Sequence, residues 1–244
     1  MSEMLRALIE KEVTRNNGSG PKAVTLISHD WGAFLTYQFT KSYPEMVEAI
    51  VSLDVGMGAC AVDPFDVTNL LVIFAYQSYL ILCFIVSQLL PFGSFFGDIM
   101  LGLYPWKWIG PTPHEYKVPR PLNEIKSWMA YPYFQLVKEK LCTLGASPGV
   151  ANPMHFGKPL LYLYGPRKRA FFHTKAFLKD IDELASSAAD QPGAVIAASQ
   201  WHAISGCGHW MHTQAPDIVA KHISTFFLAI KDMQGPGSSR LKRT

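Results

Sequence analysis

The sequence lacks a strong net charge. Its 244 residues include 22 Lys and Arg against 19 Asp and Glu, which leaves a formal net charge of +3. Proteins that bind nucleic acids through the phosphates concentrate basic residues on one face or segment. Here the basic residues are scattered, apart from a short run between Arg240 and Arg243. We therefore expect no nucleic-acid partner.

The sequence also lacks paired cysteines. Its four cysteines show neither a CxxC pair nor the spacing of a metal site, and they are Cys60, Cys83, Cys142 and Cys207. Free thiols are typical of a reducing compartment. We expect a cytoplasmic protein without a metal ion.

An uninterrupted apolar stretch is absent from the N-terminal segment MSEMLRALIEKEV, which mixes charged and apolar residues. A secretory signal peptide needs such a stretch, so this segment is not one. It predicts an amphipathic helix instead. The residues expected on its apolar face are Leu5, Leu8, Ile9 and Val13.

Charged residues are missing altogether between Asp66 and Asp98. The apolar run from Leu70 to Leu90 has about the length of the ~20 residues that cross a bilayer. Gln77 and Ser78 interrupt it, and no Lys or Arg cluster flanks it. Two interpretations stay open, a buried or substrate-facing helix pair and a segment associated with a membrane.

Strand and helix patterns alternate at the two ends of the chain. We expect strands at residues 23–27 and 47–53 joined by a helix at 32–42, which makes the two strands parallel neighbours in an α/β sheet. Later segments repeat the pattern, with strands at 158–165 and 195–204 and helices at 173–186 and 216–231. Residues 57–156 show no strand alternation and many prolines, and indicate a helical insertion. The expected organisation is a core of residues 1–56 and 157–232, a lid of residues 57–156, and a disordered tail at 233–244.

The first strand ends in Ser28-His29-Asp30-Trp31-Gly32. This is the small-x-nucleophile-x-Gly pattern of a strained strand-to-helix turn, with aspartate as the nucleophile. A carboxylate there can attack a carbon electrophile and form an ester, which water then cleaves. The backbone N–H of Trp31 would stabilise the oxyanion. The alternative is that Asp30 caps the following helix.

The motifs HDWGAF and GCGHW, with a helical insertion between them, resemble the α/β-hydrolase superfamily over residues 24–227. The branch most similar contains the epoxide hydrolases and haloalkane dehalogenases, which use an aspartate nucleophile and no cofactor. The resemblance implies that Asp30 is the nucleophile and that His209 activates water. The third member would be Asp54, because the loop after Gly165 contains no acid. The alternatives are a turn-capping histidine at His209 and an ordinary strand-end acid at Asp54.

The resemblance further implies an apolar small-molecule substrate. An epoxide hydrolase needs a lid hydroxyl to protonate the opening oxygen, and Tyr131 and Tyr133 in MAYPYF are the candidates, with Tyr116 a weaker one. Each of these could instead be a packing aromatic. A haloalkane dehalogenase would use the Trp31 indole to hold the leaving halide.

The strands and the H-G-x-P loop that this family carries before the elbow do not occur in the sequence. We therefore expect an N-terminally truncated α/β-hydrolase fold, with a mostly parallel sheet whose elbow strand has an open edge. Two functions are compatible with this truncated fold. One is a hydrolase that acts through an aspartyl ester, and the other is a catalytically impaired remnant or isoform with a binding or membrane-associated role.

Overall fold

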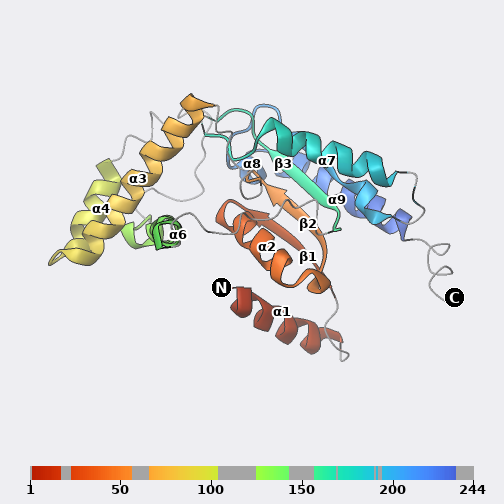
Figure 1. Cartoon of the computed structure of the whole chain (residues 1–244), viewed down its shortest axis with the longest axis horizontal. Helices are drawn as coiled ribbons and strands as arrows, with labels where there is room; N and C mark the ends of the chain where they lie inside the picture. Colours follow the sequence, from red (N-terminus) through yellow and green to blue (C-terminus); the bar gives the residue numbers. More distant parts are fainter. Residues whose placement is uncertain are drawn as a thin grey trace. The chain divides into compact units, whose positions relative to one another are not determined.

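The computed structural model describes residues 2–17, 23–56, 66–103, 125–142, 157–168, 170–189, 191 and 194–234. Figure 1 labels helices α and strands β, and short 3-10 helices are called η here. The elements in chain order are α1 Ser2–Asn17, β1 Val24–His29, α2 Trp31–Ser42, η1 Pro44–Met46, β2 Val47–Leu53, α3 Val67–Leu89, α4 Gly93–Leu103, η4 Ser127–Ala130, α6 Tyr131–Cys142, β3 Leu160–Tyr164, α7 Lys175–Ala188, η6 Val195–Ala198, β4 Gln200–Ala203, α8 Met211–Gln214 and α9 Pro216–Met233.

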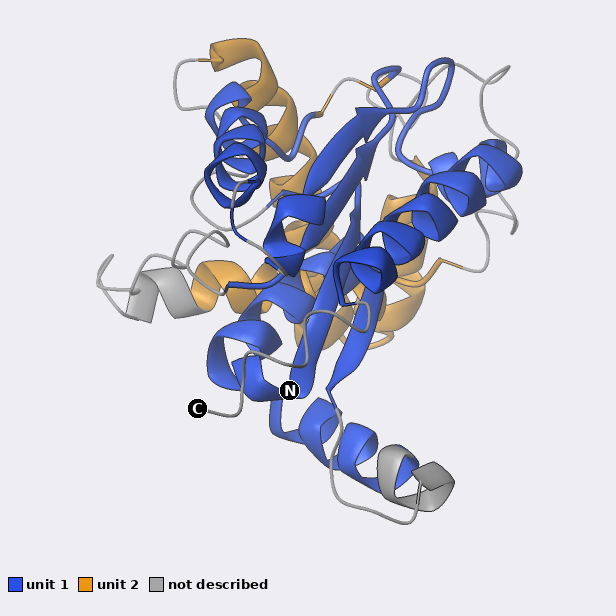
Figure 2. Ribbon diagram, turned by 90° about the vertical axis from the view of Figure 1, so that its right-hand side faces the viewer, with its two compact units in different colours: residues 1–63, 150–167, 171–244 blue, residues 64–149, 168–170 orange. Residues whose placement is uncertain are grey.

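The chain divides into two compact units, coloured separately in Figure 2. The first unit contains residues 1–63, 150–167 and 171–244, and therefore all four strands. The second contains residues 64–149 and 168–170, and its described elements are helical.

The sheet of the first unit has the strand order β1-β2-β3-β4, and each neighbouring pair is parallel. Side chains alternate between its faces, as expected for strands covered on both sides. Ile50 and Tyr162 pack with α1, α2 and α7, whereas Val51 and Leu161 pack with α8 and α9. The doubly covered parallel sheet predicted from the sequence is confirmed.

The strand β1 lies at one edge of this sheet and pairs only with β2. Ile27 on β1 is exposed as a result. Because all four strands are parallel, their carboxyl ends meet along one side of the sheet, where ligands of α/β proteins usually bind.

Two local predictions were wrong in part. Residues 195–204 do not form one strand, because 195–198 turn into the 3-10 helix η6 before β4 begins at Gln200. A short apolar run without alternation does not distinguish the two conformations. In α1, Ile9 is buried and Leu5 packs beside it, but Leu8 is exposed. The disordered tail expected at 233–244 begins too early, because Met233 still belongs to α9; residues 235–244 lie outside the described residues.

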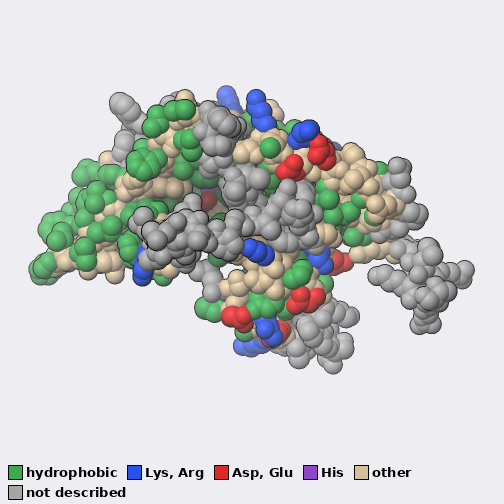
Figure 3. Space-filling model, in the orientation of Figure 1, with side chains coloured by type: hydrophobic (Ala, Val, Ile, Leu, Met, Phe, Trp, Pro, Cys, Tyr) green, Lys and Arg blue, Asp and Glu red, His purple; other side chains and the backbone are tan. Residues whose placement is uncertain are grey.

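The charge-free segment forms a helical hairpin in the second unit. Its first arm is α3, whose N-terminus is capped by the Asp66 carboxylate accepting from the Asn69 N–H at 2.9 Å. Its second arm is α4, and both arms pack on residues of η4 and α6 in one apolar cluster. In the part of the chain that the structure describes, α3 is the one helix long and apolar enough to cross a membrane. Hydrophobic side chains gather over this hairpin in Figure 3.

Candidate active site

Asp30 occupies the sharp turn between β1 and α2, with φ 54° and ψ −122°. This conformation lies outside the regions that non-glycine residues prefer, and such strain clusters at functional positions. The Asp30 side chain makes no capping hydrogen bond to α2. The helix-cap interpretation is therefore wrong for this residue.

The small residues of the motif bring the two sides of the turn together. A Cβ atom added to Gly32 would lie 3.7 Å from the Cβ of Ser28, an ordinary contact distance. A methyl group would fit there, and a larger side chain would meet Ser28. The spacing of Ser28 and Gly32 therefore allows β1 to pass directly into α2.

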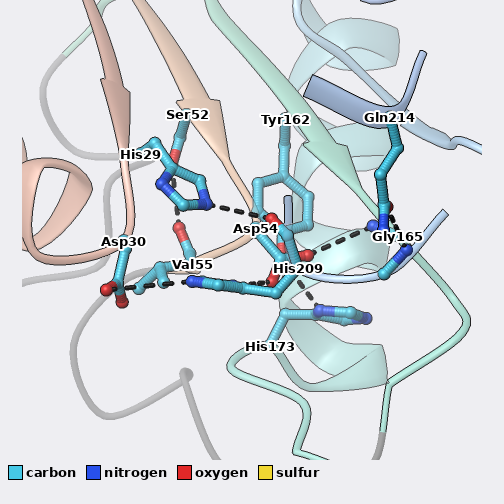
Figure 4. A network of polar contacts seen from close by, with 11 residues as sticks. His29, Asp30, Ser52, Asp54, Val55, Tyr162, Gly165, His173, His209 and Gln214 are labelled. Carbon is cyan, nitrogen blue, oxygen red and sulfur yellow. Dashed lines mark hydrogen bonds and ion pairs between the residues drawn. The ribbon is translucent and has the colours of Figure 1, made fainter. Parts of the chain in front are cut away.

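His209 and Asp54 form a short hydrogen bond at the carboxyl edge of the sheet (Figure 4). The Nδ1–H of His209 donates to Oδ2 of Asp54 at 2.6 Å, and the N–H of Gly165 donates to Oδ1 at 3.1 Å. Asp54 is fully buried and follows β2 at φ 71°. Both of its oxygens thus accept a hydrogen bond, which offsets the cost of burying the charge.

Gly165 allows this arrangement because the backbone of a distant loop passes directly over it. A Cβ atom added to Gly165 would lie 2.0 Å from the carbonyl oxygen of Gly208. The same loop is held by Gln214, whose Oε1 accepts from the Gly208 N–H at 2.8 Å. The sequence carries no signal for this contact, because the two glycines are far apart along the chain.

The other ring nitrogen of His209 faces Asp30. Its Nε2 lies 3.8 Å from Oδ2 of Asp30, an ion-pair distance longer than a hydrogen bond. Because a carboxylate only accepts, the bond to Asp54 places a proton on Nδ1. When the imidazole is neutral, Nε2 carries no proton and its lone pair faces Asp30. Nε2 can therefore act as a base on a group bound at the Asp30 carboxylate.

The charges of the site are coupled through His209. Burial lowers the pKa of His209, but its contacts with the carboxylates of Asp30 and Asp54 outweigh this and raise the pKa to about 9. Burial likewise raises the pKa of Asp30, but His209 outweighs it and the net shift is downward. At neutral pH the site therefore holds an imidazolium between two carboxylates.

His29 connects the turn to the histidine loop. Its Nε2 lies 2.9 Å from the carbonyl oxygen of His209, which only accepts, so Nε2 carries the proton. Burial, with the positive charge of His209, lowers the pKa of His29 to about 4. Its ring lies against those of His209, Trp210 and His212, at centroid distances of 4.4, 4.9 and 4.5 Å. The sequence predicts only that His29 shapes the elbow; this bond to the histidine loop appears only in the fold.

Other predicted residues lie elsewhere. Trp31 begins α2, with its ring 5.7 Å from that of Phe34. His202 lies on β4 and His212 in α8. Tyr116 lies outside the described residues.

Tyr131 and Tyr133 belong to the second unit. Within it, Tyr131 packs against Phe84 at a ring distance of 5.7 Å, and Tyr133 against Tyr76 at 6.1 Å. Both tyrosines therefore make the contacts of packing aromatics inside that unit.

The cysteines and the acidic and histidine side chains bear on a possible metal site. Within the described ranges, no group of three or more His, Cys, Asp or Glu side chains is arranged to hold a metal ion. The two cysteines that the structure describes in full, Cys83 and Cys207, are buried free thiols.

Asp30 follows β1, Asp54 follows β2 and His209 lies in the loop after β4. This arrangement defines a class of α/β proteins whose reacting groups lie at the carboxyl ends of parallel strands. The model of the alpha/beta hydrolase family matches residues 2–222, and the chain belongs to this family. A comparison with curated proteins finds no match.

Solved structures of this family share the fold at low identity. An α/β hydrolase enzyme, MGS-M2, from a Medee basin deep-sea metagenome library is 14% identical with a TM-score of 0.54, over 93% of this chain and 70% of that chain. A candidate epoxide hydrolase from Pseudomonas aeruginosa is 18% identical (TM-score 0.51; 94% and 73%). A haloalkane dehalogenase variant, DbeA-M1, from Bradyrhizobium elkanii is 12% identical (TM-score 0.50; 94% and 72%). Two further similar structures are covered over only 66% and 63% of their length. The family and fold expected from the sequence are confirmed, and the match spans 70%, 73% and 72% of the length of the three structures named first.

Proposed function

We propose that this chain hydrolyses an apolar epoxide through a covalent ester on Asp30. The observation that carries the proposal is the linear array of Asp30, His209 and Asp54, with His209 hydrogen-bonded to one carboxylate at 2.6 Å and 3.8 Å from the other. Asp30 is the only one of the three that combines a strained turn with a partly exposed carboxylate, 37% of its side chain being accessible. In such a triad the nucleophile has to be accessible to the substrate, whereas the acid that orients the histidine can be buried.

The first step forms the ester. A carboxylate oxygen of Asp30 attacks one epoxide carbon, the carbon–oxygen bond of the ring breaks, and the released oxygen takes a proton from an acid. The turn acts as a nucleophile elbow, because it presents the carboxylate above the N-terminus of α2. Tyr131 and Tyr133 are the proposed acids, on the strength of the family resemblance.

The second step cleaves the ester. Alkylation neutralises Asp30, so one of the two carboxylates that hold the proton on His209 loses its charge. The pKa of His209 then falls from about 9, and Nε2 becomes free to take a proton from water. The hydroxide adds to the ester carbonyl, where the backbone N–H of Trp31 stabilises the oxyanion. Collapse breaks the bond to the alkoxide, which takes the proton held by His209 and leaves as the diol. The proton left on the carboxyl group of Asp30 returns to the acid of the first step, which restores both groups. Asp54 keeps the ring oriented throughout.

A haloalkane dehalogenase reaction is the second candidate. It would use the same Asp30 ester and the same His209 step, with halide as the leaving group beside the Trp31 indole. The similarity to the dehalogenase variant supports dehalogenation to the same extent as the similarity to the candidate epoxide hydrolase supports epoxide hydrolysis. The array therefore supports the ester chemistry, and the substrate distinguishes the two.

The test traps the intermediate. In His209→Gln the ester should form and persist, so incubation with an apolar aryl epoxide should add the mass of the epoxide to the peptide that contains Asp30. The matched control His202→Gln leaves the array intact and should show turnover without accumulation. Addition of an alkyl group from a haloalkane, with none from the epoxide, would support the second candidate.

A folded His209→Gln sample that acquires no adduct from either substrate would overturn the ester mechanism. It would favour the catalytically impaired alternative. An adduct that persists in His209→Gln/Asp30→Asn would show that another residue reacts, which also contradicts the proposal.

A further inference from the structure

The end of the α3–α4 hairpin exposes a group of large apolar side chains to solvent. We call this group the hairpin tip; it comprises Leu89, Leu90, Phe92, Phe95 and Phe96, which are exposed to 75%, 52%, 85%, 64% and 47%. Turns between helices are usually polar, because water then satisfies them. An exposed apolar turn of this size marks an interaction surface.

The backbone of the tip is strained as well as exposed. Phe92 adopts φ 59°, a left-handed conformation that bulky residues rarely take. Phe92 is 85% exposed, so no packing gain is visible that would offset the strain. Such a conformation points to a contact outside the unit.

Close packing of the two arms holds the tip in place. A Cβ atom at Gly93 would lie 2.4 Å from the carbonyl oxygen of Val86, and one at Gly97 would lie 2.7 Å from that of Cys83. The spacing of these glycines is the GxxxG pattern that brings helix backbones together in bilayers. The tip is therefore presented on a rigid hairpin and does not fold back onto it.

The chemistry of the tip matches a lipid surface better than a protein surface. Protein interfaces surround an apolar centre with a polar, charged rim. No charged residue occurs between Asp66 and Asp98, so the tip has no charged rim from its own hairpin. Exposed aromatic side chains at the end of an amphipathic element are typical of membrane interfaces.

The charged residues nearest to the tip limit how deeply the hairpin can enter a bilayer. Asp98 pairs with Lys126 at 3.3 Å and accepts from the hydroxyl of Ser127 at 2.8 Å. At a rise of about 1.5 Å per residue, Asp98 lies roughly 8 Å along α4 from Gly93. Interfacial elements bury their apolar faces by about 5–10 Å, which places this ion pair at the level of the headgroups.

The same ion pair argues against a full crossing by α3. Insertion along its whole length would carry Asp98 and Lys126, which pair beside the hairpin, into hydrocarbon, where charged groups are strongly disfavoured. We propose that the hairpin tip inserts into the interfacial layer of a lipid bilayer and docks the protein there without crossing it. This inference concerns binding and does not rest on the proposed function.

The test measures binding of the full chain to zwitterionic phosphatidylcholine vesicles by co-sedimentation. Because the tip has no basic residue, binding should be unchanged between low and high salt. Leu89→Asp should weaken the partition coefficient about tenfold, and Leu89→Asp/Phe92→Asp should abolish measurable binding. The matched control is Leu228→Asp on α9, which introduces the same charge at a leucine with 60% exposure.

Three results would overturn the inference. Equal loss in Leu228→Asp would show a non-specific effect of charge. Binding only to anionic vesicles, abolished by salt, would assign it to basic residues elsewhere. Concentration-dependent dimerisation without vesicle binding, lost in Leu89→Asp, would identify a second copy of the chain as the occupant.

Discussion

The hydrogen bond between Asp54 and His209 makes the sharpest prediction about the site. Asp54→Asn keeps the shape of the side chain and removes its charge. In the native protein each carboxylate oxygen accepts one bond, at 3.1 Å from Gly165 and at 2.6 Å from His209. Asparagine has only one oxygen, so its amide nitrogen must face one of these two N–H donors. The replacement therefore removes a charge and leaves one donor without an acceptor.

The size of the effect follows from the contact. A hydrogen bond to a charged group contributes about 1.5–3 kcal/mol, and one pKa unit corresponds to about 1.4 kcal/mol. The pKa of His209, raised to about 9 by the two carboxylates, should therefore fall by about 1–2 units in Asp54→Asn. Hydrolysis of the Asp30 ester should slow on the order of 10³-fold or more, because the ring loses its orientation and tautomer.

The assay is an NMR titration of the His209 ring protons, assigned by comparison with His209→Gln. It needs no substrate, so it is independent of whether the chain is active. Asp30→Asn serves as the matched comparison: its carboxylate is more exposed and 3.8 Å away, and the pKa of His209 should fall less. A His209 pKa in folded Asp54→Asn equal to that of the wild type would refute the coupling. A larger fall in Asp30→Asn than in Asp54→Asn would refute the assignment of Asp54 as the dominant partner.

Three further predictions concern stability. Since folding raises the pKa of His209 from 6.5 to about 9, its contribution is fully present below pH 6.5 and is lost as the pH rises towards 9. Urea unfolding should show a decline of up to about 3 kcal/mol across that window, which His209→Gln removes. His29→Gln retains a donor at the position of Nε2, so its free energy of unfolding should stay near that of the wild type. The shorter His29→Asn should lose about 1 kcal/mol of stability. Equal losses in the two variants would contradict the bond to the His209 carbonyl. Gly165→Ala places a methyl group 2.0 Å from the carbonyl oxygen of Gly208 and should cost about 3 kcal/mol of stability or prevent folding. Gly32→Ala places one 3.7 Å from the Cβ of Ser28 and should be tolerated. A lower thermal stability for Gly32→Ala than for Gly165→Ala would contradict this packing.

Local patterns in the sequence were sufficient for the parts of the fold that depend on neighbouring residues. The turn at Asp30 needs small residues two positions away on each side, and Ser28 and Gly32 stand there. The apolar run at 47–53 predicts a strand in a parallel α/β sheet, and the structure packs its neighbouring residues Ile50 and Val51 on opposite faces. The boundary of β4 was missed because an apolar run without alternation is compatible with either conformation.

The partners within the site were decided by the tertiary structure. Asp54, Gly165 and His209 are separated by long stretches of chain, and only the parallel order of β1 to β4 brings their loops to one edge. Sequence reasoning could nominate Asp54, but the direction of each ring nitrogen of His209, and the bond from His29 to its carbonyl, depend on distances set by that order. The sequence by itself thus determined which groups are candidates for the site, because residue type and turn strain are local. Only the fold decided how they are paired, because contacts between distant residues are formed by packing of the whole sheet.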